Sequence, residues 1–224
     1  MNFAAPDPDF GLLHAGLEEQ RAAPRFTSLI RAAKLVCGQG EFVCVVRDVS
    51  SVGVRLRCFH DVPRDVGMAL ELQNGEFFPI ELVRCEGNEA SFRFLASVPV
   101  ERLVQEAWLY PRRSLRLNIA IPLTLRTLTG PAAAMTQNIS QQGCRLECGV
   151  PLAISQPVIV ESPHLPDIRA KVRWRQGGAC GLVFDDTFTL ADFALHAARL
   201  QYPELAAARP VSHREKVPAA LTAR

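Results

Sequence analysis

The sequence predicts a mainly β protein made of two small β-barrels in tandem, each followed by a C-terminal helix. Two observations lead to this fold class. A segment of about ninety residues occurs twice along the 224-residue chain, and each copy holds a series of short strand patterns separated by turn residues. A repeat of this kind indicates two copies of one module, and five or six short strands per module favour a small barrel.

A motif of the form Asx-x-Ser-x-x-Gly marks the repeat. It occupies residues 48–53 in the first copy and 138–143 in the second, and a strand pattern follows it in both. The same offset holds to the end of each copy, where residues 92–94 correspond to 182–184. We therefore predict a flexible N-terminal arm, two domains and a flexible tail, at residues 1–20, 21–108, 109–202 and 203–224 respectively.

Short, alternating segments rich in β-branched residues predict the strands. In the first copy they lie at residues 41–47, 53–58, 68–72, 78–83 and 90–94. In the second copy they lie at residues 119–128, 135–139, 143–148, 157–161, 168–175 and 180–184. Helices are predicted at residues 99–108 and 190–200, because apolar residues recur on one face of each and Thr189 can cap the second.

The composition predicts a cytoplasmic chain without membrane insertion. No apolar run approaches the roughly 20 residues that cross a bilayer, and the N-terminus lacks the basic start and apolar stretch of a secretory signal. The net charge of +2 and the aromatic content of 7% argue against DNA or RNA as a partner. Seven cysteines without a CxxC pair indicate reduced core thiols, so we expect neither a metal site nor a disulfide framework.

Arginines gather at the junction of the two copies. Arg112, Arg113 and Arg116 follow directly after residues 108–111, which join the copies. The chain as a whole is nearly neutral, so this local cluster of cations suggests a small anion as the ligand.

The second copy resembles a PilZ domain. The resemblance rests on the arginine-rich segment 112–123, the motif at 138–143, the triplet at 172–174 and the segment 181–184. The PilZ family carries an RxxxR motif before its first strand and a (D/N)xSxxG motif on its second and third strands, and it binds the bacterial second messenger cyclic di-GMP. Both motifs stand here in that order, and the resemblance covers the whole second copy.

The resemblance implies a ligand-binding site built from both motifs. Its residues would be Arg112, Arg113, Arg116, Asn138, Ser140 and Gly143. The arginines would hold phosphate and guanine, because a planar guanidinium forms paired hydrogen bonds and stacks on a base. Asn138 and Ser140 would meet a guanine edge and neighbouring polar groups, and Gly143 would let the backbone turn and the ligand approach. Trp174 is expected to pack the barrel.

The first copy is also similar to a PilZ domain, but its arginine motif can be aligned in two ways. Matching residues 24–25 to 111–112 places Leu29 opposite Arg116, which breaks the motif but keeps the Pro-Arg pair and later apolar positions. Matching residues 21–25 to 112–116 preserves the motif and needs a smaller length change. We favour the first alignment and a degenerate first site; the second alignment would give a further site at Arg21, Arg25, Asp48, Ser50 and Gly53.

Two functions from different classes follow. The first is a cyclic di-GMP receptor, without catalytic activity or cofactor, whose ligand orders the linking segment, changes the orientation of the barrels and signals to a downstream protein partner. The second is an adaptor of two degenerate PilZ barrels that binds protein partners without nucleotide. The five histidines are scattered singly, and none stands in a catalytic pattern. A homodimer, and either one or two nucleotides per site, are compatible with the sequence.

Overall fold

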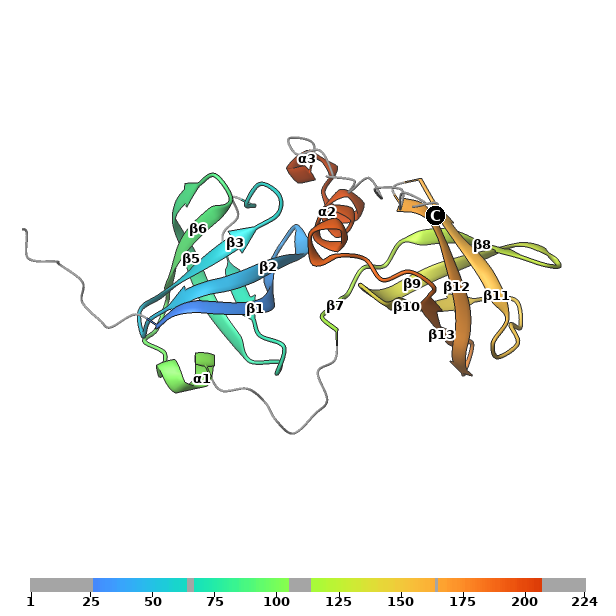
Figure 1. Ribbon diagram of the computed structural model, residues 1–224, viewed down its shortest axis with the longest axis horizontal. Helices are drawn as coiled ribbons and strands as arrows, with labels where there is room; N and C mark the ends of the chain where they lie inside the picture. The colour runs from blue at the N-terminus through green and yellow to red at the C-terminus, as the bar shows by residue number, and fades with distance from the viewer. Residues whose placement is uncertain (1–25, 64–66, 105–113, 164, 207–224) are drawn as a thin grey trace, which may run out of the picture.

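The computed structural model describes residues 26–63, 67–104, 114–163 and 165–206. Two antiparallel barrels follow one another along the long axis of the molecule, and the last two helices lie between them (Figure 1). The prediction of a mainly β chain with two barrels in tandem is confirmed. In these four segments no helix combines the length and the apolar character that a bilayer span requires.

The first barrel is a closed ring of six strands in the order β1-β2-β3-β6-β5-β4. Its strands are β1 (Phe26–Cys37), β2 (Gly40–Val49), β3 (Gly53–Cys58), β4 (Met68–Glu71), β5 (Phe77–Glu86) and β6 (Glu89–Phe94). The helix α1 (Val100–Val104) follows β6. The rest of the helix predicted here, residues 105–108, lies outside the described residues.

The second barrel repeats this ring. Its strands are β7 (Arg116–Leu117), β8 (Pro122–Thr127), β9 (Gly130–Ser140), β10 (Gly143–Cys148), β11 (Pro157–Ser162), β12 (Leu165–Gln176) and β13 (Ala179–Phe184). The ring runs β8-β9-β10-β13-β12-β11 and closes through the pairing of β11 with β8, while the short β7 pairs with β9 beside β8. The helices α2 (Leu190–Gln201) and α3 (Pro203–Ala206) complete the described chain.

Each barrel has its own hydrophobic core, because successive side chains of a strand point alternately inward and outward. β2 departs from this alternation, since all five residues from 42 to 46 are buried. The helix α2 contacts β2, and Val43 of β2 packs into the core of the second barrel. In return, Ala198 of α2 packs into the core of the first barrel. The outer face of β2 is therefore an interface between the two halves of the chain.

The sequence prediction missed β1. The pairing of β1 with β2 shifts register between Thr27 and Arg31. Such an irregularity breaks the alternation by which a strand is recognised in a sequence. In the second copy the same path is divided between β7 and β8, which both pair with β9.

The C-terminal end of the fold agrees with the prediction in one helix and differs in the next. Thr189 caps α2 as predicted, with its Oγ1 accepting a hydrogen bond from the backbone N–H of Asp192 over 3.1 Å. The first four residues of the predicted tail, 203–206, instead form α3. The backbone N–H of Asp61 donates to the carbonyl oxygen of Leu205 over 3.1 Å, which attaches α3 to the first barrel.

The glycine of each repeated motif stands where two strands come very close. A Cβ atom on Gly53 would lie 2.7 Å from the carbonyl oxygen of Phe92. A Cβ atom on Gly143 would collide with the carbonyl oxygen of Leu182. These oxygens belong to the backbones of β6 and β13 and cannot move without disturbing the sheet, so the neighbouring strand is what requires glycine at both positions.

We therefore expect Gly143→Ala to destabilise the second barrel by about 1–3 kcal/mol, the usual cost of forcing atoms into a packed site. The free energy of unfolding from urea denaturation measures the loss. Gly149→Ala is the matched control, because a Cβ atom there would meet nothing within 4 Å. Equal stability of the two variants would contradict this explanation of the motif glycine.

Two cysteines of the second barrel, Cys144 and Cys180, are buried thiols with raised pKa values. None of the seven cysteines, all of which lie in the described part of the chain, forms a disulfide. Burial, followed by the neighbouring Cys180, raises the pKa of Cys144 to about 12. Burial, followed by the neighbouring Cys148, raises the pKa of Cys180 to about 11. At neutral pH both groups are protonated and behave as small apolar side chains.

Thiol labelling at about pH 8 should reach exposed thiols before the buried thiols with raised pKa values, because only the thiolate is nucleophilic. A limiting amount of an alkylating reagent is expected to modify the exposed Cys85 and to leave Cys144 and Cys180 unmodified in the folded protein. Mass spectrometry of the labelled peptides, with and without denaturant, measures the difference. Rapid labelling of Cys144 without denaturant would show that its environment is not as closed as described.

Candidate functional site

The arginine segment and the Asx motif of the second copy meet on the outside of the second barrel. The Nη1 of Arg116 donates a hydrogen bond to the Oδ1 of Asn138 over 3.0 Å. This contact follows from the pairing of β7 with β9, in which Arg116 is opposite Ser140 and Leu117 is opposite Ile139. Leu117 is buried and Arg116 is exposed. The guanidinium therefore lies at the surface beside the motif.

The serine of the motif closes the turn between β9 and β10. The Ser140 hydroxyl donates to the carbonyl oxygen of Gly143 over 3.0 Å and accepts from the backbone N–H of Gln142 over 3.4 Å. In the first copy the Ser50 hydroxyl likewise donates to the carbonyl oxygen of Gly53, over 3.3 Å. Ser140 is only 2% exposed, so its hydroxyl serves the local turn. Of the three defining residues of the motif, Asn138 is the one with a polar side chain at the surface.

Strand register aligns two further surface residues with Asn138. Asn138 is opposite Arg145 in β10, Arg145 is opposite Gly181 in β13, and Gly181 is opposite Trp174 in β12. The Arg145 guanidinium carbon lies 5.8 Å from the centre of the Trp174 ring system, within the range of a cation–π contact. We call Arg116, Asn138, Arg145 and Trp174 the outer row.

Trp174 packs against the outside of the barrel wall. It is 39% exposed, and its indole occupies the space above Gly181, where a Cβ atom would collide with it. Trp174 therefore packs against the barrel, as expected, but it does so on the outer face and not in the core. Sequence reasoning did not select Arg145, although its position two residues after the motif glycine, out of phase with the buried Cys144 and Leu146, marks it as outward-facing.

The equivalent row of the first barrel has different chemistry. Asp48 is opposite Arg55, as Asn138 is opposite Arg145. The Nε of Arg55 lies 3.1 Å from Oδ2 of Asp48, and its Nη1 lies 3.3 Å from Oε2 of Glu89. Following the register, the position of Trp174 is taken by Arg84, which pairs with Glu86 at 3.2 Å. This row is a chain of ion pairs without an aromatic ring.

Strand register also bears on the two alignments of the first arginine motif. Phe26 is opposite Val49, just as Leu117 is opposite Ile139. Because Val49 and Ile139 are equivalent residues of the motif, chain position 25 corresponds to position 116. This favours the alignment of residues 21–25 with 112–116 over the alignment that we preferred from the sequence. Arg21, Arg25, Arg112 and Arg113 themselves lie outside the described residues.

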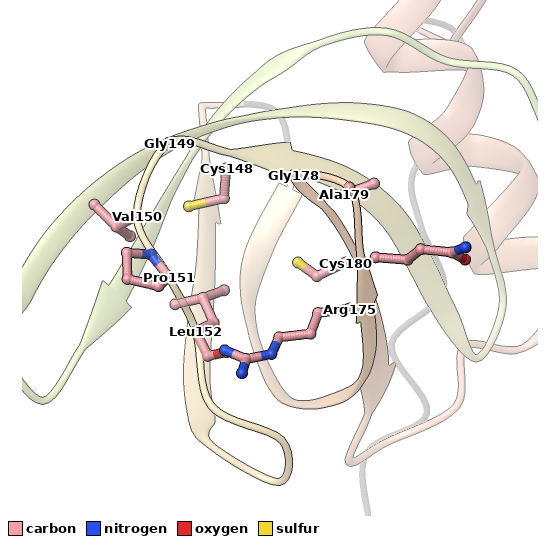
Figure 2. Close-up of a pocket in the computed structure, with 11 residues that line it drawn as sticks. Cys148, Gly149, Val150, Pro151, Leu152, Arg175, Gly178, Ala179 and Cys180 are labelled. Carbon is pink, nitrogen blue, oxygen red and sulfur yellow. The ribbon is translucent and has the colours of Figure 1, made fainter.

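A cavity of about 450 Å³ lies at the opposite end of the second barrel (Figure 2). It is bordered by the end of β10, the connection to β11 and the turn between β12 and β13, with Cys148 and Cys180 on its wall. The Nη1 of Arg175 donates to the carbonyl oxygen of Leu152 over 2.9 Å at its edge. Neither motif contributes to this cavity. In the described part of the chain no group of three or more His, Cys, Asp or Glu side chains is placed to hold a metal ion.

Three solved structures are named here from among those that match this chain. The first is the PlzA protein of Borreliella burgdorferi in complex with c-di-GMP, with 12% identity, coverage of 78% of this chain and 88% of that chain, and a TM-score of 0.33. The second is YcgR from Escherichia coli in complex with c-di-GMP, with 9% identity, coverage of 75% of this chain and 82% of that chain, and a TM-score of 0.32. The third is the Bacillus subtilis inhibitor of motility, with 13% identity, coverage of 82% of this chain and 100% of that chain, and a TM-score of 0.31. No curated protein matches the chain in sequence.

The sequence of the second half matches a known family over almost the whole of its barrel. Residues 110–201 match the family model described as PilZ domain. The match begins before β7 and ends at the last residue of α2, so it contains both motifs and every strand of the second ring. The second barrel of this chain is therefore a PilZ domain.

Proposed function

We propose that this chain is a receptor for cyclic di-GMP, and that it binds the dinucleotide on the outer face of the second barrel. One observation carries the proposal: the hydrogen bond of 3.0 Å from Arg116 to Asn138 joins the arginine segment to the Asx motif. Two motifs that are 22 residues apart in the sequence thus contribute to a single surface. The nucleotide-bound PlzA and YcgR structures belong to proteins of related shape and are consistent with this ligand.

The outer row supplies the chemical groups that a guanine dinucleotide requires. The ligand carries two phosphates and two purine bases. Guanidinium groups offer forked donors to phosphate oxygens and to the acceptor edge of guanine, and they also stack on bases. The Trp174 indole offers a flat surface, and the Asn138 amide can both donate to and accept from a base edge. The proposed contacts are Arg112, Arg113, Arg116, Asn138, Arg145 and Trp174, with Ser140 and Gly143 shaping the turn.

We place the nucleotide on the second barrel alone. In the first barrel, Arg55 is already paired with Asp48 and Glu89. An anionic ligand would have to displace these ion pairs and then face two carboxylates. In the equivalent row, as far as the structure describes it, Arg84 takes the place of the indole that could stack on a base. The alignment that strand register favours retains the arginine spacing in the first copy. The carboxylates of Asp48 and Glu89 on that barrel wall nevertheless oppose the same ligand.

The position of the site suggests how binding is transmitted. Residues 112–116 belong to the segment that links the barrels, and α2 packs into both cores. A nucleotide held at this segment would bias the relative orientation of the barrels and so alter a surface that a partner protein recognises. The receptor would then act by binding alone, without a catalytic step.

Calorimetric titration with cyclic di-GMP tests the assignment. Arg116→Ala should weaken binding by roughly ten- to a hundredfold, since a charge-assisted hydrogen bond contributes about 1.5–3 kcal/mol. Trp174→Ala should weaken it by roughly tenfold, through the loss of stacking on a base. Arg55→Ala is the matched control, because Arg55 holds in the first barrel the position that Arg145 holds in the second, and it should bind as the wild type does.

Two outcomes would contradict the proposal. Equal losses in Arg55→Ala and Arg116→Ala would show that the site does not distinguish the barrels in this way. A folded wild-type protein that gives no heat of binding would favour the other function, an adaptor that binds protein partners without nucleotide.

A further inference from the structure

We propose that Glu41 of the first barrel is a positioning residue for the nucleotide site of the second barrel. This inference rests on the proposed function and adds a residue that neither motif contains. Glu41 holds Asn118, which stands two residues after Arg116. The first barrel would thereby set the place of the arginine segment on the second.

The contact between Glu41 and Asn118 has two hydrogen bonds that cross from one barrel to the other. The backbone N–H of Asn118 donates to Oε2 of Glu41 over 2.9 Å. The side-chain Nδ2 of Asn118 donates to Oε1 of the same carboxylate over 2.7 Å. Both carboxylate oxygens are used, so the contact fixes the direction of the chain at Asn118 as well as its distance.

Glu41 is itself held from both halves of the molecule. The Nζ of Lys34 lies 3.2 Å from Oε2 of Glu41 and 2.8 Å from Oε1 of Glu71. The side-chain amide of Gln201, at the end of α2, donates to the Glu41 carbonyl oxygen over 2.7 Å and accepts from the Glu41 N–H over 2.8 Å. Glu41 therefore has a fixed backbone and a paired carboxylate, as a positioning residue requires.

The strand that Glu41 supports is short and depends on its ends. β7 consists of Arg116 and Leu117 and pairs with β9 at only two positions. Arg116 attaches to Asn138 at one end, Leu117 is buried in the core, and Asn118 attaches to Glu41 at the other end. If the Glu41 contact is removed, β7 loses one of these three attachments, so it should separate from β9 more often and Arg116 should be less well placed to meet a ligand.

The coupling also acts in the opposite direction. Two binding events that favour the same arrangement strengthen each other by the same factor. A nucleotide that holds Arg116 against the barrel would therefore stabilise the bond between Asn118 and Glu41, and with it this orientation of the barrels. The contact gives a physical route from the ligand to the interface.

The test compares Glu41→Ala with Glu71→Ala in the full-length protein. Both substitutions remove one carboxylate from Lys34, but among the described contacts only Glu41 reaches Asn118. Glu41→Ala should weaken the binding of cyclic di-GMP at least about fivefold, the lower limit of a typical coupling between sites, and Glu71→Ala should leave it unchanged. Adding Asn118→Ala to Glu41→Ala should cause little further loss, because the two residues share one interaction.

Hydrogen exchange provides a measurement that needs no nucleotide. The amides of residues 116–118 should exchange faster in Glu41→Ala than in Glu71→Ala, while the melting temperatures of the two variants stay similar. Equal exchange in the two variants would overturn the proposal, and so would wild-type affinity in Glu41→Ala when Arg116→Ala has lost binding. A folded wild-type protein that does not bind the nucleotide would instead overturn the proposed function, together with any role for Glu41 in it.

Discussion

The hydrogen bond between Arg116 and Asn138 is the interaction on which the site depends. It joins a strand of only two residues to the strand that carries the Asx motif. It uses only one N–H of the Arg116 guanidinium, so the other N–H groups can still donate to a ligand. An anionic oxygen is a strong acceptor for them, because hydrogen bonds between charged groups are stronger. The proposed contact with phosphate would therefore add to the bond with Asn138.

The two barrels show how one fold can keep its architecture while its surface diverges. The buried serine hydroxyl and the glycine under a neighbouring carbonyl are the same in both copies. The outward residues differ: they are an amide, a guanidinium and an indole in the second barrel and an array of ion pairs in the first. The turn and the strand packing require the shared residues, whereas nothing in the fold itself requires the outward ones to be alike.

Much of the fold could be predicted from the sequence, because strands with one buried face alternate in hydrophobicity. β10, for example, was predicted at its observed bounds. β1 could not be recognised, because its register shift near Thr27 breaks the alternation. The apolar run 42–46 of β2 was predicted as part of an alternating strand, whereas all five of its residues are buried. A continuous apolar run is typical of a strand covered on both faces, but the sequence does not say which element covers the second face.

The site was partly predictable for similar reasons. The two motifs identified Arg116 and Asn138, which the structure brings together. Arg145 lies on β10, next to β9, whereas Trp174 lies on β12, which β13 separates from β10 in the ring. The contact between these two side chains therefore depends on strand register and not on spacing along the chain. Glu41 belongs to neither motif, and its contact with Asn118 crosses the boundary between the barrels, so the sequence gives no sign of it.

The sharing of α2 has a consequence for the independence of the two halves. Its alanine at 198 packs into the core of the first barrel, while Val43 of the first barrel packs into the core of the second. Each half therefore depends on the other for part of its interior. A chain divided between the halves would give two products with incomplete cores, so neither would be as stable as it is in the whole protein.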